Sequence, residues 1–221
     1  MELIAVIGLG YVGLPLAVNI AKHNKKVIGF DISKSRVEQL KNGVDHTGEV
    51  EPDMLAQDSI VITDDIADIA TATTFIVTVP TPITDANQPD LSALESACNT
   101  IGPFLKKGDL VVFESTVYPG VTEDVCGPIL AAKSGLTLFE DIHLGYSPER
   151  INPGDKVYTV ENIVKVISGS SPEILDRVEA IYKPVIKAGL FRCSSIKVAE
   201  TAKVMENTQR DVNIALMNEL S

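Results

Sequence analysis

Three glycines near the start of the chain constrain its fold more than any other feature. Residues 3–7 form a short apolar run, which is typical of a strand buried on both faces, and Gly8, Gly10 and Gly13 follow it. Residues 14–21 then have the pattern of a helix. A strand, a glycine turn and a helix in this order favour a dinucleotide-binding loop, whereas the glycines alone would also fit a turn in another α/β protein.

Each glycine has a specific use in such a loop. Gly8 permits a tight turn, Gly10 lets the backbone approach a pyrophosphate, and Gly13 lets the helix pack closely on the strand. The helix N-terminus offers free N–H groups and the positive end of its dipole to the phosphates. Residues 26–30 form a second predicted strand, and Asp31 at its end is placed to accept hydrogen bonds from the ribose hydroxyls of NAD. The same carboxylate would repel a 2′-phosphate, so the sequence predicts NAD rather than NADP.

The rest of the chain alternates predicted strands and helices, which indicates an α/β fold with a doubly wound, Rossmann-like parallel sheet. Further strands are predicted at residues 59–63, 74–79, 110–114, 142–146, 162–168 and 190–193, and helices at 33–42, 64–71, 90–105, 120–132 and 172–186. Thr81 and Thr116 each follow a strand, where ligands bind in such sheets, and either cofactor contact or a backbone hydrogen bond in a turn would explain them. Arg36 would either approach the adenosine end of the cofactor or be a solvated surface charge.

The composition limits what the chain can bind. Its 221 residues carry a formal net charge of −11, so it is a poor partner for nucleic acid or for an anionic membrane surface. No apolar run approaches the length of a membrane span. The three cysteines form no C-x-x-C pair, and we expect Cys98, Cys126 and Cys193 to be buried thiols of a cytoplasmic protein.

The loop at residues 147–154 places Glu149 beside Arg150 between prolines. Prolines stiffen a loop, so the two charged groups are presented to a ligand, form a surface ion pair, or belong to a simple turn. A long helix is then predicted over residues 195–221, and no stop signal precedes the last residue.

Polar and apolar groups are both aligned along this long helix. Lys203, Asn207 and Arg210 share one face, and either a functional role or pairing with acids such as Glu200 or Glu206 would explain them. Apolar residues form stripes on other sides, which is typical of a helix buried between partners. The stripes consist of Val198, Ala202, Met205, Val212 and Leu216, with Ile214 and Met217 beside them.

Five motifs follow one another over almost the whole chain. They are Gly8-Leu9-Gly10-Tyr11-Val12-Gly13-Leu14-Pro15, Val79-Pro80-Thr81-Pro82, Glu114-Ser115-Thr116-Val117, Ser147-Pro148-Glu149-Arg150, and Ala199-Glu200-Thr201-Ala202-Lys203 continuing to Asn207. In this combination the chain resembles the UDP-glucose/GDP-mannose dehydrogenase family of nucleotide-sugar 6-dehydrogenases. The Arg150 after Glu149 resembles the branch that acts on UDP-N-acetylhexosamines, since the UDP-glucose branch usually has Phe there.

The resemblance implies an NAD-binding domain at residues 1–194, followed at 195–221 by the start of a central interdomain helix. It implies a four-electron oxidation, in which the C6 alcohol of a UDP-N-acetylhexosamine becomes a carboxylate and two NAD+ are reduced. A cysteine carries the aldehyde as a thiohemiacetal and then as a thioester that water hydrolyses. The product would enter polysaccharide precursor synthesis, and no metal is implied.

The resemblance also implies roles for individual residues. Lys203 and Asn207 would stabilise oxyanions at C6, while Glu149 and Thr116 would position the hydrolytic water, with Glu149 as general base. The residues expected to contact the substrate are Glu149, Arg150, Ile151, Lys203, Asn207 and Arg210. The residues expected to contact NAD are Gly8, Gly10, Tyr11, Val12, Gly13, Asp31, Arg36, Thr81 and Thr116.

One departure from the family pattern concerns the nucleophile. The family's catalytic cysteine lies in a glycine-containing motif after the central helix, and none of the three cysteines here matches it. The chain is therefore expected to be the N-terminal half of such an enzyme, without the UDP-binding domain. Exposed apolar stripes favour self-association, so we expect a homodimer through the central helix, in a native or an artefactual arrangement.

Other functions remain open from the sequence. They are UDP-glucose 6-dehydrogenase, a related NAD-dependent hydroxyacid dehydrogenase of the 6-phosphogluconate or 3-hydroxyacyl-CoA type, and a non-catalytic NAD-binding module. The hydroxyacid dehydrogenases also carry a lysine and an asparagine on a helix after the Rossmann domain, but the Ser-Pro-Glu-Arg loop argues against them. A binding module would not need the face formed by Lys203 and Asn207.

Overall fold

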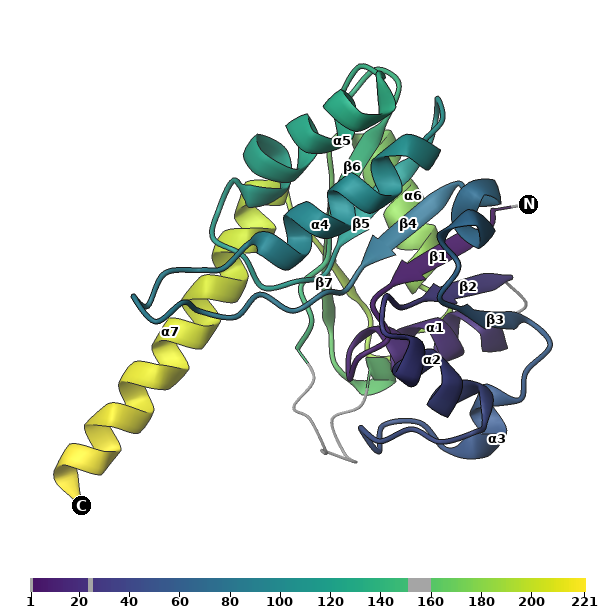
Figure 1. Cartoon of the computed structure of the whole chain (residues 1–221). Helices are drawn as coiled ribbons and strands as arrows, with labels where there is room; N and C mark the ends of the chain where they lie inside the picture. Colours follow the sequence, from purple (N-terminus) through teal and green to yellow (C-terminus); the bar gives the residue numbers. More distant parts are fainter. Residues whose placement is uncertain (1, 24–25, 151–159) are drawn as a thin grey trace.

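The computed structural model describes residues 2–23, 26–150 and 160–221. Within these ranges eight short strands form one sheet in the order β3-β2-β1-β4-β5-β6-β7-β8 (Figure 1). The strands are β1 (Ile4–Ile7), β2 (Val27–Phe30), β3 (Ile60–Thr63), β4 (Thr74–Val77), β5 (Leu110–Phe113), β6 (His143–Tyr146), β7 (Lys165–Gly169) and β8 (Leu190–Arg192). The winding reverses between β1 and β4, which is where dinucleotides bind in sheets of this order.

The first six strands run in one direction, and the last two are reversed. β1 to β6 pair in parallel, whereas β6 and β7 pair antiparallel, with Gly145 opposite Gly169 and Tyr146 opposite Ser168. β8 then runs parallel to β7. The doubly wound parallel sheet is thus confirmed for β1 to β6. Because β7 is reversed, its first residue lies at the edge where the parallel strands end.

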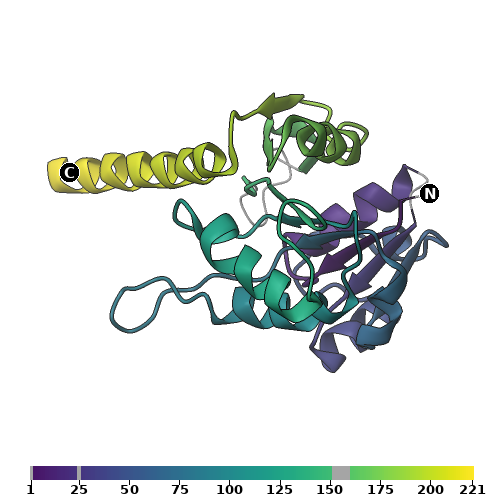
Figure 2. The same cartoon turned by 90° about the horizontal axis from the view of Figure 1, so that it is seen from above.

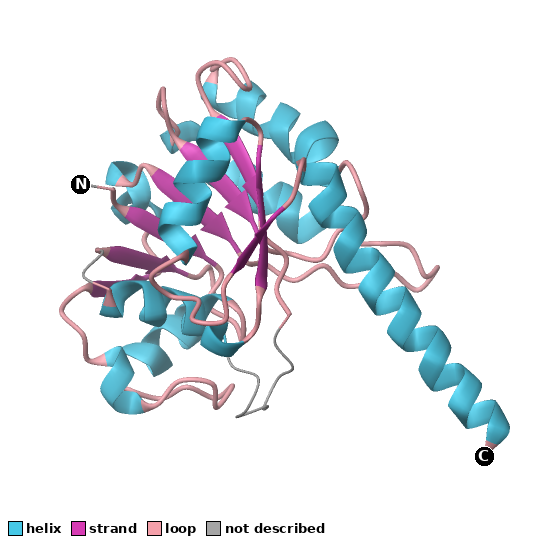
Figure 3. Cartoon of the chain, turned by 180° about the vertical axis from the view of Figure 1, so that it is seen from behind, coloured by secondary structure: helices cyan, strands magenta, loops and turns pink. Residues whose placement is uncertain are grey.

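Helices cover both faces of the sheet, as the view from behind in Figure 3 also shows. α1 (Gly13–Lys22), α2 (Lys34–Lys41) and α6 (Pro172–Tyr182) pack on one face, with the short α3 (Pro52–Leu55) beside them, while α4 (Ser92–Ile101) and α5 (Gly127–Ser134) pack on the other. In β1, Ile4 and Val6 enter the first core, and Ala5 and Ile7 enter the second. This alternation explains why the strands read as continuous apolar runs.

Several segments that were predicted as α-helices instead form 3-10 or π-type turns over part of their length. The helix expected at residues 90–105 stops at Ile101, because Pro103 has no N–H to continue the helical hydrogen bonds. The helix expected at 120–132 begins as a wide turn before α5. The structure has 3-10 turns at Ile66–Thr71, Gly102–Phe104 and Val160–Asn162 and a π-type turn at Val121–Cys126.

The long helix α7 (Ile196–Leu220) extends away from the sheet (Figure 2). Ser195 caps it, since its side chain accepts a hydrogen bond from the N–H of Val198 at 3.2 Å. Within α7 only Ile196, Ala199 and Glu200 are buried. Met205 is 62% exposed, and the other predicted stripe residues beyond it are also exposed, so the described part of this chain does not cover the apolar stripes.

Other classes of site are absent from the residues that the structure describes. No helix there is both long and apolar enough to cross a membrane. No cluster of three His, Cys, Asp or Glu side chains suited to a metal ion occurs among the same residues. The three cysteines are free and buried, as predicted.

The tight packing around Gly13 leads to a prediction about stability. A Cβ on Gly13 would lie 1.9 Å from the carbonyl oxygen of Gly8 and 2.3 Å from Oγ1 of Thr78, whereas a Cβ on Gly10 would meet no atom within 4 Å. We expect Gly13→Ala to lower the free energy of unfolding by about 1–3 kcal/mol, since overpacking against backbone outweighs the better helix propensity of alanine. Gly10→Ala should change it by less than about 0.5 kcal/mol. Urea denaturation of both variants measures the difference, and equal midpoints would contradict this account.

Candidate active site

A pocket of about 610 Å³ lies at the carboxyl edge of the parallel strands. The loops after β1, β2, β4 and β5 form most of it, and α7 contributes one wall. Its lining residues are Gly8, Gly10, Tyr11, Val12, Asp31, Thr78, Val79, Pro80, Thr81, Pro82, Glu114, Ser115, Thr116, Glu149, Lys203 and Asn207. The fold therefore brings most of the predicted cofactor residues together with all four predicted catalytic residues.

The glycine loop at the base of the pocket is held by backbone hydrogen bonds. Gly8 has φ of +95°, a left-handed conformation that favours glycine, and its N–H donates to the carbonyl of Phe30 at 2.8 Å. The hydroxyl of Thr78 donates to the Gly8 carbonyl at 2.7 Å. Gly13 does not line the pocket, because it fills the contact between α1 and this loop instead.

Asp31 connects the glycine loop to the end of β2. Its Oδ2 accepts the N–H of Leu9 at 2.8 Å, and its Oδ1 accepts the N–H of Ser33 at 2.9 Å. Each carboxylate oxygen has a second lone pair, so Asp31 can hold the loop and still accept the hydroxyls of a ribose. Its contact with the cofactor stays a prediction.

Arg36 lies under the glycine loop rather than in the pocket wall. Its side chain is buried, Nε donates to the carbonyl of Leu9 at 2.9 Å, and the guanidinium pairs with Asp45 at 2.7 Å. The interpretation of Arg36 as a solvated surface charge is therefore wrong. Its approach to the adenosine end of the cofactor stays a prediction.

Thr81 and Thr116 meet across the pocket edge. The hydroxyl of Thr81 donates to the carbonyl of Thr116 at 2.6 Å, and the hydroxyl of Ser115 donates to the carbonyl of Val79 at 2.5 Å. These bonds join the loops after β4 and β5, which is a structural role for the side chains of Thr81 and Ser115, whereas Thr116 takes part through its backbone carbonyl. Both threonines also line the pocket, and their contacts with NAD and water stay predictions.

α7 places Lys203 and Asn207 on the pocket side of the helix, as the spacing predicted. Burial lowers the pKa of Lys203 and outweighs the nearby carboxylates of Glu206 and Glu149, which raise it. A lysine of this kind releases a proton more readily than an exposed one and still supplies N–H donors. Lys203 also lines a second pocket of about 270 Å³, together with Arg150 and Glu206.

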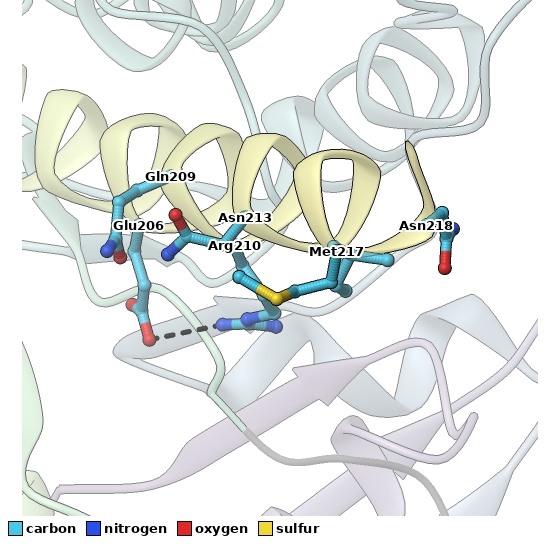
Figure 4. A pocket seen from close by; sticks show the side chains of 7 residues that line it. Glu206, Gln209, Arg210, Asn213, Met217 and Asn218 are labelled. Carbon is cyan, nitrogen blue, oxygen red and sulfur yellow. Dashed lines mark hydrogen bonds and ion pairs between the residues drawn. The ribbon is translucent and has the colours of Figure 1, made fainter. Parts of the chain in front are cut away.

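The arginines predicted to contact substrate are paired with one acid. Glu206 accepts from the guanidinium of Arg150 at 2.9 Å and from that of Arg210 at 3.2 Å. Figure 4 shows the paired side chains of Arg210 and Glu206 on the same side of α7, among residues that line another pocket. Neither arginine lines the large pocket, and Ile151 lies outside the described residues. Arg210 therefore forms the ion pair with Glu206 that was one of its two predicted explanations. The guanidinium of Arg150 pairs with Glu206 and not with Glu149.

Sequence reasoning missed two buried acids with structural roles. Glu200 is fully buried and accepts the N–H groups of Gly120 at 2.6 Å and Thr122 at 3.0 Å, which attaches the first turns of α7 to the segment after β5. Glu114, in the motif after β5, is also buried, and burial raises its pKa to about 7. For Glu114, an acid directly after the apolar run of β5 was the available signal.

A third group that the sequence reasoning missed is Lys165, the first residue of β7. Its ammonium lies 3.0 Å from Oε2 of Glu114 and 3.3 Å from Oε2 of Glu149. Burial lowers the pKa of Lys165, but the attraction of the two carboxylates outweighs burial and raises it. A single lysine among the apolar residues of β7 was the only indication in the sequence.

Comparison with known proteins identifies the family. The sequence profile described as "UDP-glucose/GDP-mannose dehydrogenase family, NAD binding domain" matches residues 2–186. The chain is 55% identical over 219 residues to a UDP-N-acetyl-D-glucosamine 6-dehydrogenase of Pseudomonas aeruginosa, an alignment that covers 99% of this chain and 52% of that protein. It is 39% identical over 230 residues to a UDP-N-acetyl-D-mannosamine dehydrogenase of Yersinia pestis, covering 100% and 54%.

Solved structures agree with the sequence matches. A UDP-N-acetylmannosamine dehydrogenase from Pyrococcus horikoshii superposes with a TM-score of 0.92 at 35% identity, covering 99% of this chain and 53% of that one. The chain thus spans about half the length of the curated relatives it matches. A family profile that covers residues 2–186, together with a dinucleotide loop at the expected switch point of the sheet, shows that the chain belongs to the UDP-glucose/GDP-mannose dehydrogenase family and carries its NAD-binding domain.

Proposed function

We propose that the complete protein oxidises the C6 alcohol of a UDP-N-acetylhexosamine to the carboxylate, with two NAD+ reduced per sugar, and supplies polysaccharide precursors. The observation that carries the proposal is the shared pocket, in which the dinucleotide loop after β1 faces Lys203 and Asn207 of α7. The relatives with the highest identities reported above are named for UDP-N-acetylhexosamines, which supports this substrate class.

The positions of the residues that line the pocket support a separate role for each of them in the proposed reaction. The glycine loop and Asp31 would hold NAD, which would supply the acceptor for a hydride from C6. Lys203 and Asn207 donate hydrogen bonds to the oxygen on C6 as negative charge develops there, and donors fixed on a helix need little rearrangement during the reaction. Glu149 takes a proton from the water that hydrolyses the thioester, and Thr116 orients that water. Arg150, Ile151 and Arg210 are proposed contacts of the UDP-sugar.

A homodimer through α7 is part of the proposal. The exposed apolar side chains of α7 support it, since a helix with uncovered stripes associates with another apolar surface. Three free, buried cysteines support a reducing, cytoplasmic setting.

The test of the proposed function compares substrates and chain lengths. We expect the complete protein to form two NADH for each UDP-N-acetylhexosamine consumed and to react much less with UDP-glucose or 6-phosphogluconate. The 221-residue chain should bind NAD but give no steady NADH production, because none of its three cysteines lines the pocket and the covalent route needs a thiol at C6. Absorbance at the NADH band measures NADH production by either chain, and product chromatography measures how much of each sugar is consumed. Turnover of 6-phosphogluconate by the complete protein, or of a UDP-sugar by the short chain, would refute the respective part.

Lys203 tests the catalytic assignment. In the complete protein Lys203→Ala should lower kcat about a hundredfold or more with little change in KM, because an oxyanion donor acts mainly in the transition state. The control is Lys197→Ala, which removes an exposed lysine of the same helix that pairs with Asp124 outside the pocket. A raised KM with unchanged kcat would reduce Lys203 to a contact with the ground-state substrate.

Asp31 tests the cofactor assignment. Asp31→Asn removes the charge but keeps an acceptor for one of the two N–H groups it binds. We expect roughly a tenfold or greater loss of NAD affinity and a narrower preference for NAD over NADP, since a hydrogen bond to a charged group contributes about 1.5–3 kcal/mol. Calorimetric titration of the 221-residue chain measures both affinities, with the exposed Asp53→Asn as control. Equal binding of NAD and NADP by the unmodified chain would contradict the assignment.

A further inference from the structure

One buried cation connects the core of the sheet to the wall of the pocket. The ammonium of Lys165 lies between Glu114 and Glu149, at 3.0 and 3.3 Å from their carboxylate oxygens. The Lys165 and Glu114 side chains are only 5% and 0% exposed, whereas Glu149 is 12% exposed and lines the pocket. The ammonium therefore contacts two carboxylates that line the pocket, of which Glu149 is the more exposed.

The reversed direction of β7 creates this contact. Lys165 is the first residue of β7, and β7 runs antiparallel to β6. In a parallel strand the first residue would lie at the opposite edge of the sheet, far from the loop after β6. The loop that carries Glu149 follows β6 directly, so the reversal places the ammonium against it.

Three further contacts hold the cluster in place. Oε1 of Glu114 accepts the hydroxyl of Tyr182 at 2.5 Å, while Oε2 of Glu114 accepts from Lys165. The ammonium also lies 5.2 Å from the centre of the Tyr182 ring, a cation–π distance. The N–H of Glu149 donates to the carbonyl of Glu114 at 3.4 Å, so backbone and side chain hold the two acids together.

Stability alone is a weak reason to bury such a cluster. Removing charges from water costs several kcal/mol per ion, and an apolar replacement of a buried ion pair is often neutral or stabilising. A buried ammonium in contact with the pocket carboxylate of Glu149 has a further effect, because it fixes the position of that carboxylate and favours its ionised form.

We propose that Lys165 is a positioning residue, which holds the Glu149 carboxylate at the pocket wall through a buried charge cluster anchored by Glu114 and Tyr182. The inference rests on the proposed function for the use made of Glu149, but the contact itself does not depend on any substrate. Lys165 acts through Glu149 and does not line the pocket.

The proposal predicts the protonation of Glu149. An ammonium in direct contact favours the ionised carboxylate, so loss of Lys165 should raise the pKa at which Glu149 takes up a proton. The carboxylate of Glu114, which follows β5, has the opposite effect, because a like charge disfavours ionisation of Glu149. From α7, Lys203 acts on Glu149 as a second cation. Arg150, which follows Glu149 after β6, and Arg210 of α7 are both paired with Glu206. The test must therefore change Lys165 while holding the other charges constant.

The first experiment titrates Glu149 in the 221-residue chain with 13C-labelled glutamate carboxyls, and Glu149→Gln identifies the signal. Lys165→Met alone leaves Glu114 buried without its cation, and this variant can fail to fold. The decisive comparison is therefore Glu114→Gln against Glu114→Gln/Lys165→Met, in which only the ammonium differs. We expect the Glu149 midpoint to rise by about one pH unit or more in the double variant. Lys183→Met, which removes an exposed lysine paired with Glu179 next to Tyr182, should leave it unchanged.

The second experiment measures kcat against pH in the complete protein for the same variants. The acidic limb should move to higher pH by about one unit or more in the double variant, while the affinity for NAD stays the same. An unchanged Glu149 midpoint and an unchanged acidic limb would overturn the inference and leave Lys165 as a purely structural residue. If the unmodified protein oxidises no UDP-sugar, the proposed function fails, whereas the titration still decides the role of Lys165.

Discussion

The contact between the first turn of α1 and the end of β1 is the constraint on which the site depends. At residue 13 the helix lies so close to the carbonyl of Gly8 that no side chain fits. This approach aims the N-terminus of α1 at the pocket, where its free N–H groups and dipole favour phosphate. Thr78 and Asp31 then hold the loop from the neighbouring strands, at 2.7 Å and 2.8 Å. The phosphate-binding part of the site is thus built from backbone, which suits a chain with a net charge of −11.

The side chains that we propose as catalytic come from elements that lie far apart in the sequence. Glu200 attaches α7 to the segment after β5 by accepting two backbone N–H groups, and Lys203 and Asn207 follow within two turns of the same helix. The segment after β6 supplies Glu149 to the same pocket. Donors on a helix and a carboxylate in one pocket with the dinucleotide loop suit the proposed reaction, in which a reacting carbon lies between donors and a base.

The reversal of β7 has consequences for both stability and chemistry. It closes the parallel sheet with one antiparallel pair, and it brings Lys165 to the edge where ligands bind. The buried acid Glu114, with a pKa raised to about 7, would be costly there without that cation and the hydroxyl of Tyr182. The same cluster then reaches the pocket through Glu149.

The sequence by itself determined the dinucleotide unit and the faces of the long helix. Local patterns were sufficient, because a strand, three glycines, a helix and Asp31 lie within one short stretch, and because helical periodicity places Lys203 and Asn207 together. Only the tertiary structure decided which distant groups meet. The direction of β7, the burial of Arg36 beneath Leu9, the pairing of Arg150 with Glu206 and the cluster around Lys165 all depend on contacts between separate elements. Charge pairing across a folded sheet has no period along the chain, so residue spacing alone does not encode it.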